Sequence, residues 1–489
     1  MVRRHRTVAA LLTVGLALPS TAAYADSAGV QVRGPAAVVG SVELEGAGAG
    51  SASAAQAAVR PQVAPTPPPV LTPVADGVAV DQEAVASVIT DDLDSDWLGD
   101  RAHVGVAVFD VETGEKLFSR LADQGLTPAS TTKLLAAAAI VNALPMDEPF
   151  RTEVVTGPEA DQIVLVAGGD MMLARGAGDP DAVEGHAGLG DLADQTAAAL
   201  KERGLGVDGH QVRLRLDTSY ASGPIRPEGW TDYWLDEGFT GPITLLGLQE
   251  DRAVPYNPAP RDPAQATAIA FRQALTERGI DVGGGPATEV PREVAREGAE
   301  QLGVVESSPA RDVLAEAMSS SDNAMVEQLA RQAAVADGAS AEPAAVRDWV
   351  VQQVADYGVD TTGVTIADVS GLSDGSLIPV RVLAELLVIG ADGSHPEFSE
   401  VLRELPIAGY TGTLWDRFHL DAHDPAVGVA RAKTGSLPGV TSLAGLVVTR
   451  DSRLLAYAVI ADEVGQDGAG LEARSVIDTI IAELAACGC

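Results

Sequence analysis

The sequence predicts an α+β fold, an antiparallel sheet covered by helices, into which a smaller α/β domain is inserted. Alternating apolar and polar residues predict strands at 103–110 and 116–120, joined through the hairpin signal Glu112–Thr113–Gly114. The run from Ser130 to Leu144 is apolar almost all round, which is typical of a helix buried at a domain centre. The chain closes on three strand patterns and one helix pattern, at 427–434, 441–449, 454–461 and 471–486.

The middle of the chain predicts the inserted domain, which we place at 157–304. Its strand patterns lie at 163–167 and 211–216, and its helix patterns lie at 191–203 and 264–278. The main domain then comprises residues 80–156 and 305–489. Its remaining helix patterns lie at 309–318, 323–336, 343–357 and from Pro379 onward.

The N-terminus resembles a secretory signal. Arg3, Arg4 and Arg6 precede an apolar run over 7–18 and the small-residue cleavage pattern Ala23–Tyr24–Ala25. The run is shorter than the ~20 apolar residues that a membrane-spanning helix requires. We therefore expect a signal peptide at 1–25, cleaved near Ala25, and an exported protein that acts outside the cytoplasm or at the cell wall. Residues 26–79 are rich in Ala and Pro and predict a linker that packs no core.

The composition argues against several function classes. A formal charge of −36 disfavours nucleic acid as a partner, since such binding needs a basic face. The seven histidines include no H-E-x-x-H motif, and we assign no metal and no cofactor. The two cysteines, Cys487 and Cys489, stand at the very end, where we expect a frayed tail rather than a strained local disulfide.

Lysine usage points to a possible base. Only four of the 33 cationic residues are lysines, Lys116, Lys133, Lys201 and Lys433. A buried lysine can lose its proton and act as a base, whereas arginine stays charged. Lys133 lies inside the most apolar helix pattern, three residues after Ser130, so both side chains share one helix face. Alone, this pair fits a helix cap and a solvated lysine better than it fits a nucleophile and its base.

Two further motifs change that balance. Ser321–Asp322–Asn323 lies between two predicted helices, where an ordinary capping turn is the simpler interpretation. Lys433–Thr434–Gly435–Ser436 closes a predicted strand, where an edge lysine before a glycine turn is equally ordinary. Ser-x-x-Lys, Ser-x-Asn and Lys-Thr-Gly in this order are, however, the three motifs of penicillin-binding proteins and class A β-lactamases.

The surrounding residues resemble one family in particular, the low-molecular-mass class C penicillin-binding proteins, which are the D-Ala-D-Ala carboxypeptidases of the S13 peptidase family. The resemblance covers the chain from about Val80 to the C-terminus. It implies the fold of penicillin-binding proteins and serine β-lactamases. The similar segments read T-P-A-S-T-T-K-L-L-A-A-A-A (127–139), L-V-A-G-G-D-M-M-L (165–173), L-R-L-D-T-S-Y-A-S-G-P-I-R-P-E-G-W (214–230), D-V-S-G-L-S (368–373), L-P-I-A-G-Y-T-G-T-L (405–414) and R-A-K-T-G-S-L-P-G-V-T-S-L-A-G (431–445).

The resemblance implies a role for each motif residue. Ser130 would attack the penultimate D-Ala carbonyl, and Lys133 would take its proton. Ser321 would relay the proton to the leaving nitrogen, while Asn323 would orient Lys133 and bind the substrate amide. Lys433 would lower neighbouring pKa values, and the strand Thr434–Gly435–Ser436 would bind the substrate carboxylate. The backbone N–H groups of Ser130 and Ser436 would form the oxyanion hole.

The family also grips the peptide's diamino acid with residues of its inserted region. Trp234 and Asp236 are our candidates for that role, and Leu372 of the D-V-S-G-L-S segment is a further candidate for substrate contact. In the family, this insert carries two extra domains. Here 321 − 130 leaves 191 positions, and residues 244–252 run almost directly into 261–267. We expect the outermost inserted domain to be missing or reduced.

The resemblance implies peptidoglycan stem peptides as substrates and β-lactam antibiotics as covalent inhibitors, with DD-endopeptidase activity left open. A β-lactamase is disfavoured because its first two motifs lie far closer together. A Ser-His-Asp hydrolase is disfavoured because Ser-x-x-Lys, Ser-x-Asn and Lys-Thr-Gly occur together and in this order. A non-catalytic wall-binding or scaffold protein of the same fold remains the main alternative.

Overall fold

The computed structural model describes residues 77–285, 288–465 and 469–488, all within one compact unit. The predicted signal peptide at 1–25 and nearly all of the predicted linker at 26–79 lie outside these residues. Within the described part of the chain, none of the helices combines the length and apolar character that crossing a membrane requires.

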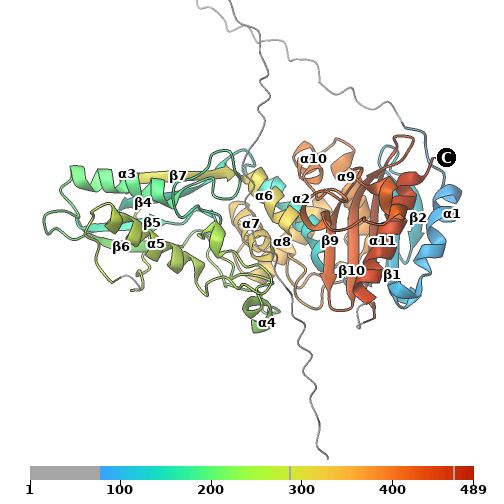
Figure 1. The fold of residues 1–489 in the computed structure, drawn as a ribbon, viewed down its shortest axis with the longest axis horizontal. Coiled ribbons are helices and arrows are strands. Elements are labelled where there is room, and N and C mark those ends of the chain that lie inside the picture. Colours follow the sequence, from blue (N-terminus) through green and yellow to red (C-terminus); the bar gives the residue numbers. More distant parts are fainter. Residues whose placement is uncertain (1–76, 286–287, 466–468, 489) are drawn as a thin grey trace, which may run out of the picture. The chain divides into compact units, whose positions relative to one another are not determined.

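The larger of the two main sheets has five antiparallel strands (Figure 1). The sheet joins the two ends of the described chain, because β1, near the start, pairs along its full length with β11, near the end. The strands, in spatial order, are β2 (Lys116–Arg120), β1 (Val104–Asp110), β11 (Leu454–Ala461), β10 (Val440–Val448) and β9 (Ala430–Leu437).

Alternation along the strands gives this sheet two apolar faces. Val104, Val106 and Val108 of β1 pack in one core with two helices, α1 (Gln82–Leu93) and α11 (Ala469–Ala486). Ala107 and Phe109 point the other way, into a second core. The helices of that core are α2 (Lys133–Ala143), α6 (Ala310–Ser320), α7 (Asn323–Ala336), α8 (Pro343–Asp356), α9 (Val380–Ala391) and α10 (Pro396–Arg403).

Helix α2 is buried at the centre of the second core, as its apolar pattern predicts. Nine of its 11 residues are buried, Lys133 among them. The predicted helix start at Ser130 differs from the structure, because Ala129–Thr132 form a 3-10 turn and α2 begins at Lys133. The reason is local: the hydroxyls of Thr131 and Thr132 donate to the carbonyls three residues back, which tightens the turn.

A second, mixed sheet has four strands. β5 pairs in parallel with β6, and β4 pairs antiparallel with β5 and β7. Helices α3 (Leu189–Glu202) and α5 (Pro263–Glu277) share its apolar core. The strands, in spatial order, are β6 (Arg213–Asp217), β5 (Gln162–Val166), β4 (Pro149–Thr156) and β7 (Gln301–Pro309).

The inserted domain remains a proposal, and the second sheet suggests different limits for it. The sequence places the insert at 157–304, which would separate β4 from its partner β5 and divide β7 between the two domains. We therefore propose that the insert begins at Pro149 and ends at Pro309.

The other short elements are the strand pair β3 (Gly125–Leu126) with β8 (Ile378–Pro379), and helix α4 (Asp232–Asp236).

The C-terminal end is packed where a frayed tail was expected. Cys487 is buried in the core that α11 shares with the larger sheet, and its N–H donates to the carbonyl of Glu483. The apolar face of α11 continues to its last turn and holds this residue in place. Cys489 lies outside the described residues.

A buried ion pair ties the β1 end to the β10–β11 turn. Arg453 donates to both carboxylate oxygens of Asp110, at 2.6 and 2.7 Å, and both side chains are buried. Burial opposes ionisation, but hydrogen bonds from Arg453 and from the Thr113 backbone hold the pKa of Asp110 below its ordinary value. The pair therefore joins two chain segments that are 343 positions apart.

We predict that Arg453→Met lowers the free energy of unfolding by about 3 kcal/mol, because Asp110 would be left as a buried, unpaired charge. Urea unfolding followed by circular dichroism measures the loss. Arg151→Met is the matched control, because the ion pairs of Arg151 with Glu153 and Glu306 are exposed and such pairs contribute about 0–1 kcal/mol. Equal effects of the two substitutions would contradict the prediction.

Candidate active site

Ser130 lies on a turn that two glycines support from either side. Ala129, just before it, has a φ of +49°. A Cβ on Gly371 would lie 1.9 Å from the carbonyl oxygen of Ala129, and a Cβ on Gly435 would lie 2.7 Å from that of Pro128. Only glycine permits such close approaches of backbone to backbone. The Gly of Lys-Thr-Gly and the Gly of D-V-S-G-L-S therefore both fix the position of Ser130.

Lys133 places its amine between three oxygen atoms. Its Nζ lies 3.0 Å from Ser130 Oγ, 2.5 Å from Asn323 Oδ1 and 2.7 Å from the carbonyl oxygen of Ser370. The amide and carbonyl oxygens can only accept hydrogen bonds, so together they occupy two N–H groups. In the neutral amine, which has two, the lone pair is then left facing the Ser130 hydroxyl.

The environment of Lys133 favours loss of its proton. The side chain is fully buried, and burial lowers the pKa of Lys133 to about 8, although Asp368, Glu327 and Asp322 oppose that change. Burial and the nearby charge of Asp368 raise the pKa of Glu327 to about 8, even though this carboxyl accepts hydrogen bonds from Val369 and Ser370. Glu327 is therefore mostly neutral at pH 7 and opposes the deprotonation of Lys133 only weakly.

The Ser321–Asp322–Asn323 turn joins α6 to α7. Ser321 ends α6 in the left-handed region, with a φ of +60°. Asp322 caps α7 by accepting from the Met325 backbone at 2.9 Å. Asn323, at the start of α7, accepts from Lys133 and donates through Nδ2 to the carbonyl of Phe239, at 3.0 Å. The turn therefore presents two polar side chains to the same region as Ser130.

Lys433 is the second buried amine of the site. From β9, its Nζ donates to Ser321 Oγ at 2.8 Å and to the carbonyl of Thr434 at 3.0 Å. Burial and the charge of Lys133 lower the pKa of Lys433 well below its ordinary value. The two amines therefore influence each other's protonation.

These groups open onto a cleft of about 740 Å³. Ser130, Ser321, Thr434, Gly435 and Ser436 line it. Arg417 and Arg474 line it too, and Arg474 of α11 donates to Ser436 Oγ at 2.8 Å. Neither arginine was among the residues that the sequence singled out, because no motif spacing connects the last helix to the strand Lys433–Ser436.

The loop 368–373 is organised around one buried carboxylate. Asp368 Oδ1 accepts from Ser370 Oγ and from the N–H groups of Gly371 and Leu372, while Oδ2 accepts from the Ser373 backbone and from Trp230 Nε1. This arrangement holds the Ser370 carbonyl on Lys133. Asp368 belongs to the D-V-S-G-L-S segment, but no spacing in the sequence links it to Lys133 or Trp230.

Comparison with known proteins assigns the family. The family described as "D-Ala-D-Ala carboxypeptidase 3 (S13) family" matches residues 83–256 and 248–484. The chain belongs to this family. Its members are serine-type D-Ala-D-Ala carboxypeptidases, so both the predicted family and the predicted enzyme class are confirmed.

Several relatives of this S13 enzyme are similar over most of their length. A carboxypeptidase of Mycobacterium tuberculosis is 33% identical over 448 residues, covering 89% of this chain and 92% of the relative. Carboxypeptidase DacB of Mycolicibacterium smegmatis is 32% identical, covering 78% and 80%. The solved structure of penicillin binding protein 4 from Haemophilus influenzae has a TM-score of 0.65 at 20% identity, covering 83% of this chain and 98% of that one. This likeness confirms the predicted fold class.

The S13 enzyme does not bring every predicted residue to the cleft. Trp234 packs edge-on against Phe239, with ring centroids 5.6 Å apart, and Asp236 pairs with Arg261. Leu372 is buried in the second core. None of the three lines the 740 Å³ cleft, whereas Phe239 does. Phe239 lies three residues beyond Asp236, within the segment that the sequence pointed to.

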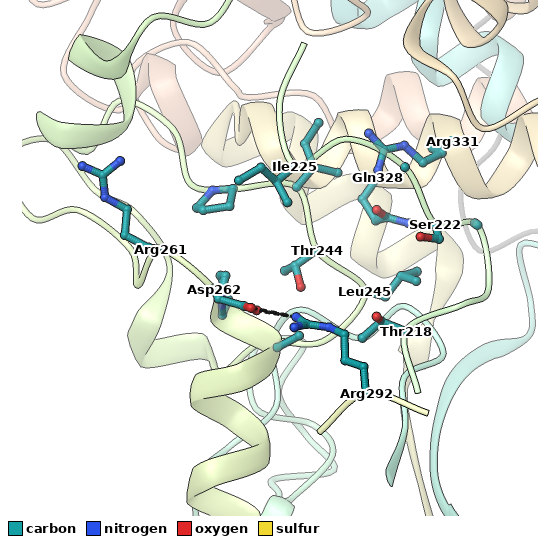
Figure 2. A pocket seen from close by; sticks show the side chains of 16 residues that line it. Thr218, Ser222, Ile225, Thr244, Leu245, Arg261, Asp262, Arg292, Gln328 and Arg331 are labelled. Atoms are coloured by element: carbon teal, nitrogen blue, oxygen red, sulfur yellow. Dashed lines mark hydrogen bonds and ion pairs between the residues drawn. The ribbon is translucent and has the colours of Figure 1, made fainter. Parts of the chain in front are cut away.

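A smaller pocket of about 80 Å³ lies where inserted segments meet α7 (Figure 2). Gln328 and Arg331 of α7 line it, and Arg331 donates to the carbonyl of Pro224 at 2.7 Å. Opposite them, Arg292 forms an ion pair with Asp262 at 2.7 Å. The pocket contains none of the motif residues, and Arg292 and Asp262 balance each other's charge in it, so we interpret it as packing between the insert and α7.

Proposed function

We propose that the S13 enzyme removes the terminal D-Ala from peptidoglycan stem peptides through an acyl-enzyme on Ser130. One observation carries this proposal. Asn323 Oδ1 and the Ser370 carbonyl accept two hydrogen bonds from Lys133 Nζ, so the third position on that nitrogen faces Ser130 Oγ. A neutral amine in that position is a base for the hydroxyl.

In the first step, Ser130 Oγ forms a bond to the penultimate D-Ala carbonyl carbon, and its proton moves to Lys133 Nζ. Charge develops on the carbonyl oxygen, for which the backbone N–H groups of Ser130 and Ser436 are the proposed donors, each typically worth about 3 kcal/mol. The C–N bond then breaks. Ser321 gives its proton to the leaving nitrogen and recovers a proton from the pair of lysines, Lys133 and Lys433. The Nζ of Lys433 lies 2.8 Å from Ser321 Oγ. In the second step, a water oxygen bonds to the ester carbonyl carbon and gives a proton to Lys133. The bond between that carbon and Ser130 Oγ then breaks, and Ser130 Oγ takes the proton back from Lys133.

The substrate itself helps to set the protonation of the lysine pair. Without substrate, Asp368 and Asp322 favour the proton on Lys133, whereas burial and the charge of Lys133 lower the pKa of Lys433 well below its ordinary value. A substrate carboxylate held by Thr434 and Ser436 would lie next to Lys433. Its charge would favour the proton on Lys433, which leaves Lys133 neutral and ready to act as the base.

Arg474 extends the proposed carboxylate site beyond the motif residues. Its guanidinium already donates to Ser436 Oγ, and Arg417, which donates to the carbonyl of Arg474 at 3.3 Å, lines the same cleft. Arginine suits a carboxylate because its planar fork donates two parallel hydrogen bonds. We propose that Ser436 and Arg474 bind the terminal carboxylate together.

Export, penicillin sensitivity and a secondary endopeptidase activity belong to the same proposal. Peptidoglycan lies outside the cytoplasm, in keeping with the signal pattern at 1–25. A β-lactam carries an acyl group and a carboxylate in the same relation as the substrate, and a β-lactam complex has been solved for penicillin binding protein 4 of Haemophilus influenzae. The substrate contacts suggested for Trp234, Asp236 and Leu372 stay proposals, and these residues lie outside the cleft lining.

We predict that a fluorescent penicillin labels the protein covalently and that Ser130→Ala abolishes the adduct. Lys133→Arg should lose labelling by at least about 100-fold, because arginine cannot give up its proton, and general-base catalysis contributes about 10²–10⁴-fold. Gel fluorescence over time measures both effects, together with release of D-Ala from a pentapeptide. A scaffold protein would form no stable adduct, and near-normal labelling of the Arg variant would exclude Lys133 as the base.

We predict that the pH dependence of acylation differs between a penicillin and its methyl ester. The rate requires neutral Lys133, so it rises as the pH passes the pKa of that amine, about 8 without a ligand. The ester should show a rise near pH 8. The free acid should show its rise at lower pH, because its carboxylate favours the proton on Lys433. Labelling rates between pH 5 and pH 10 (about the range of these groups) measure both profiles, and superimposable profiles would contradict the proton shift.

We predict that Arg474→Met weakens binding of a carboxylate-bearing substrate by about 10-fold, the effect of losing one charge-assisted hydrogen bond of about 1.5 kcal/mol. The KM for the pentapeptide should rise while kcat changes less than about threefold. The penicillin methyl ester is the control, because it has no carboxylate for Arg474 to bind. An equal loss with acid and ester would show that Arg474 does not bind the carboxylate.

A further inference from the structure

Arg252 lies in the inserted region but reaches the turn that carries Ser321 and Asn323. Its Nε and Nη2 both donate to Asp322 Oδ2, at 3.2 and 3.0 Å, and Nη2 also donates to Ser320 Oγ at 3.2 Å. Its Nη1 donates to Glu184. The side chain is only 12% exposed. A single guanidinium thus joins the insert to Ser320, which precedes the turn, and to Asp322, which is part of it.

Asp322 is held at both of its oxygens. Oδ1 caps α7 through the Met325 backbone at 2.9 Å, while Oδ2 accepts from Arg252. On one side of it in sequence, Ser321 contacts Lys433, and on the other side Asn323 contacts Lys133. A movement of Asp322 would therefore displace two polar groups of the site at once.

The conformation of the turn needs such a restraint. Ser321 has a φ of +60°, a left-handed conformation that is unfavourable for residues other than glycine. Residues in such conformations persist where the surrounding contacts hold them. The two hydrogen bonds from Arg252, with the α7 cap, supply contacts of that kind directly next to Ser321.

Arg252 is itself attached to a fixed backbone. The segment 245–249 is hydrogen-bonded along 169–173, through Gly169 N to Leu245 O at 2.9 Å and Leu173 N to Gly247 O at 3.1 Å, among others. The residues of the G-G-D-M-M-L segment thus hold the base of the loop from which Arg252 extends. The family matches to 83–256 and 248–484 overlap here, where we propose that the outermost inserted domain is missing or reduced.

We propose that Arg252 is a positioning residue. From the inserted domain, it holds the Ser321–Asp322–Asn323 turn in the conformation that acylation of Ser130 needs. The inference rests on the proposed function. Arginine is required because one planar group bonds Asp322, Ser320 and Glu184 together, which the single ammonium of lysine does less well.

The test compares Arg252→Met, Arg252→Lys and Asp322→Asn with the unaltered protein in labelling by a fluorescent penicillin. Arg252→Met should lower the second-order acylation rate by about 10- to 100-fold, as small displacements of reacting groups do. Arg252→Lys should restore part of the rate. Asp322→Asn should reproduce the loss while keeping the α7 cap, since asparagine caps well. This last variant decides the matter if Arg252→Met fails to fold.

The pH profile separates positioning from a general loss of structure. The charged and titratable groups facing Lys133 are Asp368, Glu327, Asp322 and Lys433. Arg252→Met leaves the Asp322 charge uncompensated, so the rise in rate should move to higher pH. Asp322→Asn removes that charge, so the rise should move to lower pH. Opposite shifts would show that the contact acts on the charge around Lys133, an effect that a general loss of structure would not produce.

Arg215→Met is the matched control, because Arg215 is also a part-buried arginine of the insert, paired with Glu293 at 3.2 Å and remote from the turn. It should leave the acylation rate within about twofold, as expected for a site away from the reacting groups. The inference is overturned if folded Arg252→Met and Asp322→Asn both acylate at the unaltered rate. If the unaltered protein is not labelled at all, the proposed function fails instead.

Discussion

The structure depends on one buried amine whose hydrogen-bond partners decide what it can do. Asn323 and the Ser370 carbonyl accept from Lys133 and cannot donate to it, so they fix the direction of the remaining position, which faces Ser130. Burial supplies the second requirement, since it lowers the pKa of Lys133 to about 8. Each partner comes from a different part of the chain: Ser130 from the turn before α2, Asn323 from α7, and Ser370 from the loop 368–373. The packing of the second core around α2 is therefore also the assembly of the site.

The insert contributes to this assembly through one stretch, residues 230–252. Trp230 donates to Asp368, the Phe239 carbonyl accepts from Asn323, and Arg252 donates to Asp322. Each of these partners either contacts Lys133 or holds a group that does. The three bonds to this stretch make the insert part of the support of the active site. An S13 enzyme with a reduced outer insert would keep its chemistry as long as this stretch stays in place.

The sequence could predict the reacting groups because they lie in short motifs with fixed spacing. Ser130 and Lys133 share one turn, Ser321 and Asn323 share another, and Lys433 stands beside the glycine that the Ser130 turn requires. Arg252 and Arg474 escaped prediction because their partners lie 70 and 38 positions away, at distances that only the folded chain reveals. Strands β4 and β7 were missed for a similar reason, since their pairing joins residues about 150 positions apart and leaves little local signal.

The charge of the chain sets a further condition on the cleft. With a formal charge of −36, the protein as a whole repels a stem peptide that carries carboxylates. Attraction must therefore come from local cations, and Arg417 and Arg474 line the cleft beside Ser436. Arg417 is bound to Asp478 by hydrogen bonds in a buried pair, which leaves Arg474 as the guanidinium with a donor already at the strand. Since arginine keeps its proton while Lys133 and Lys433 do not hold theirs firmly, charge for binding and protons for catalysis are assigned to different side chains.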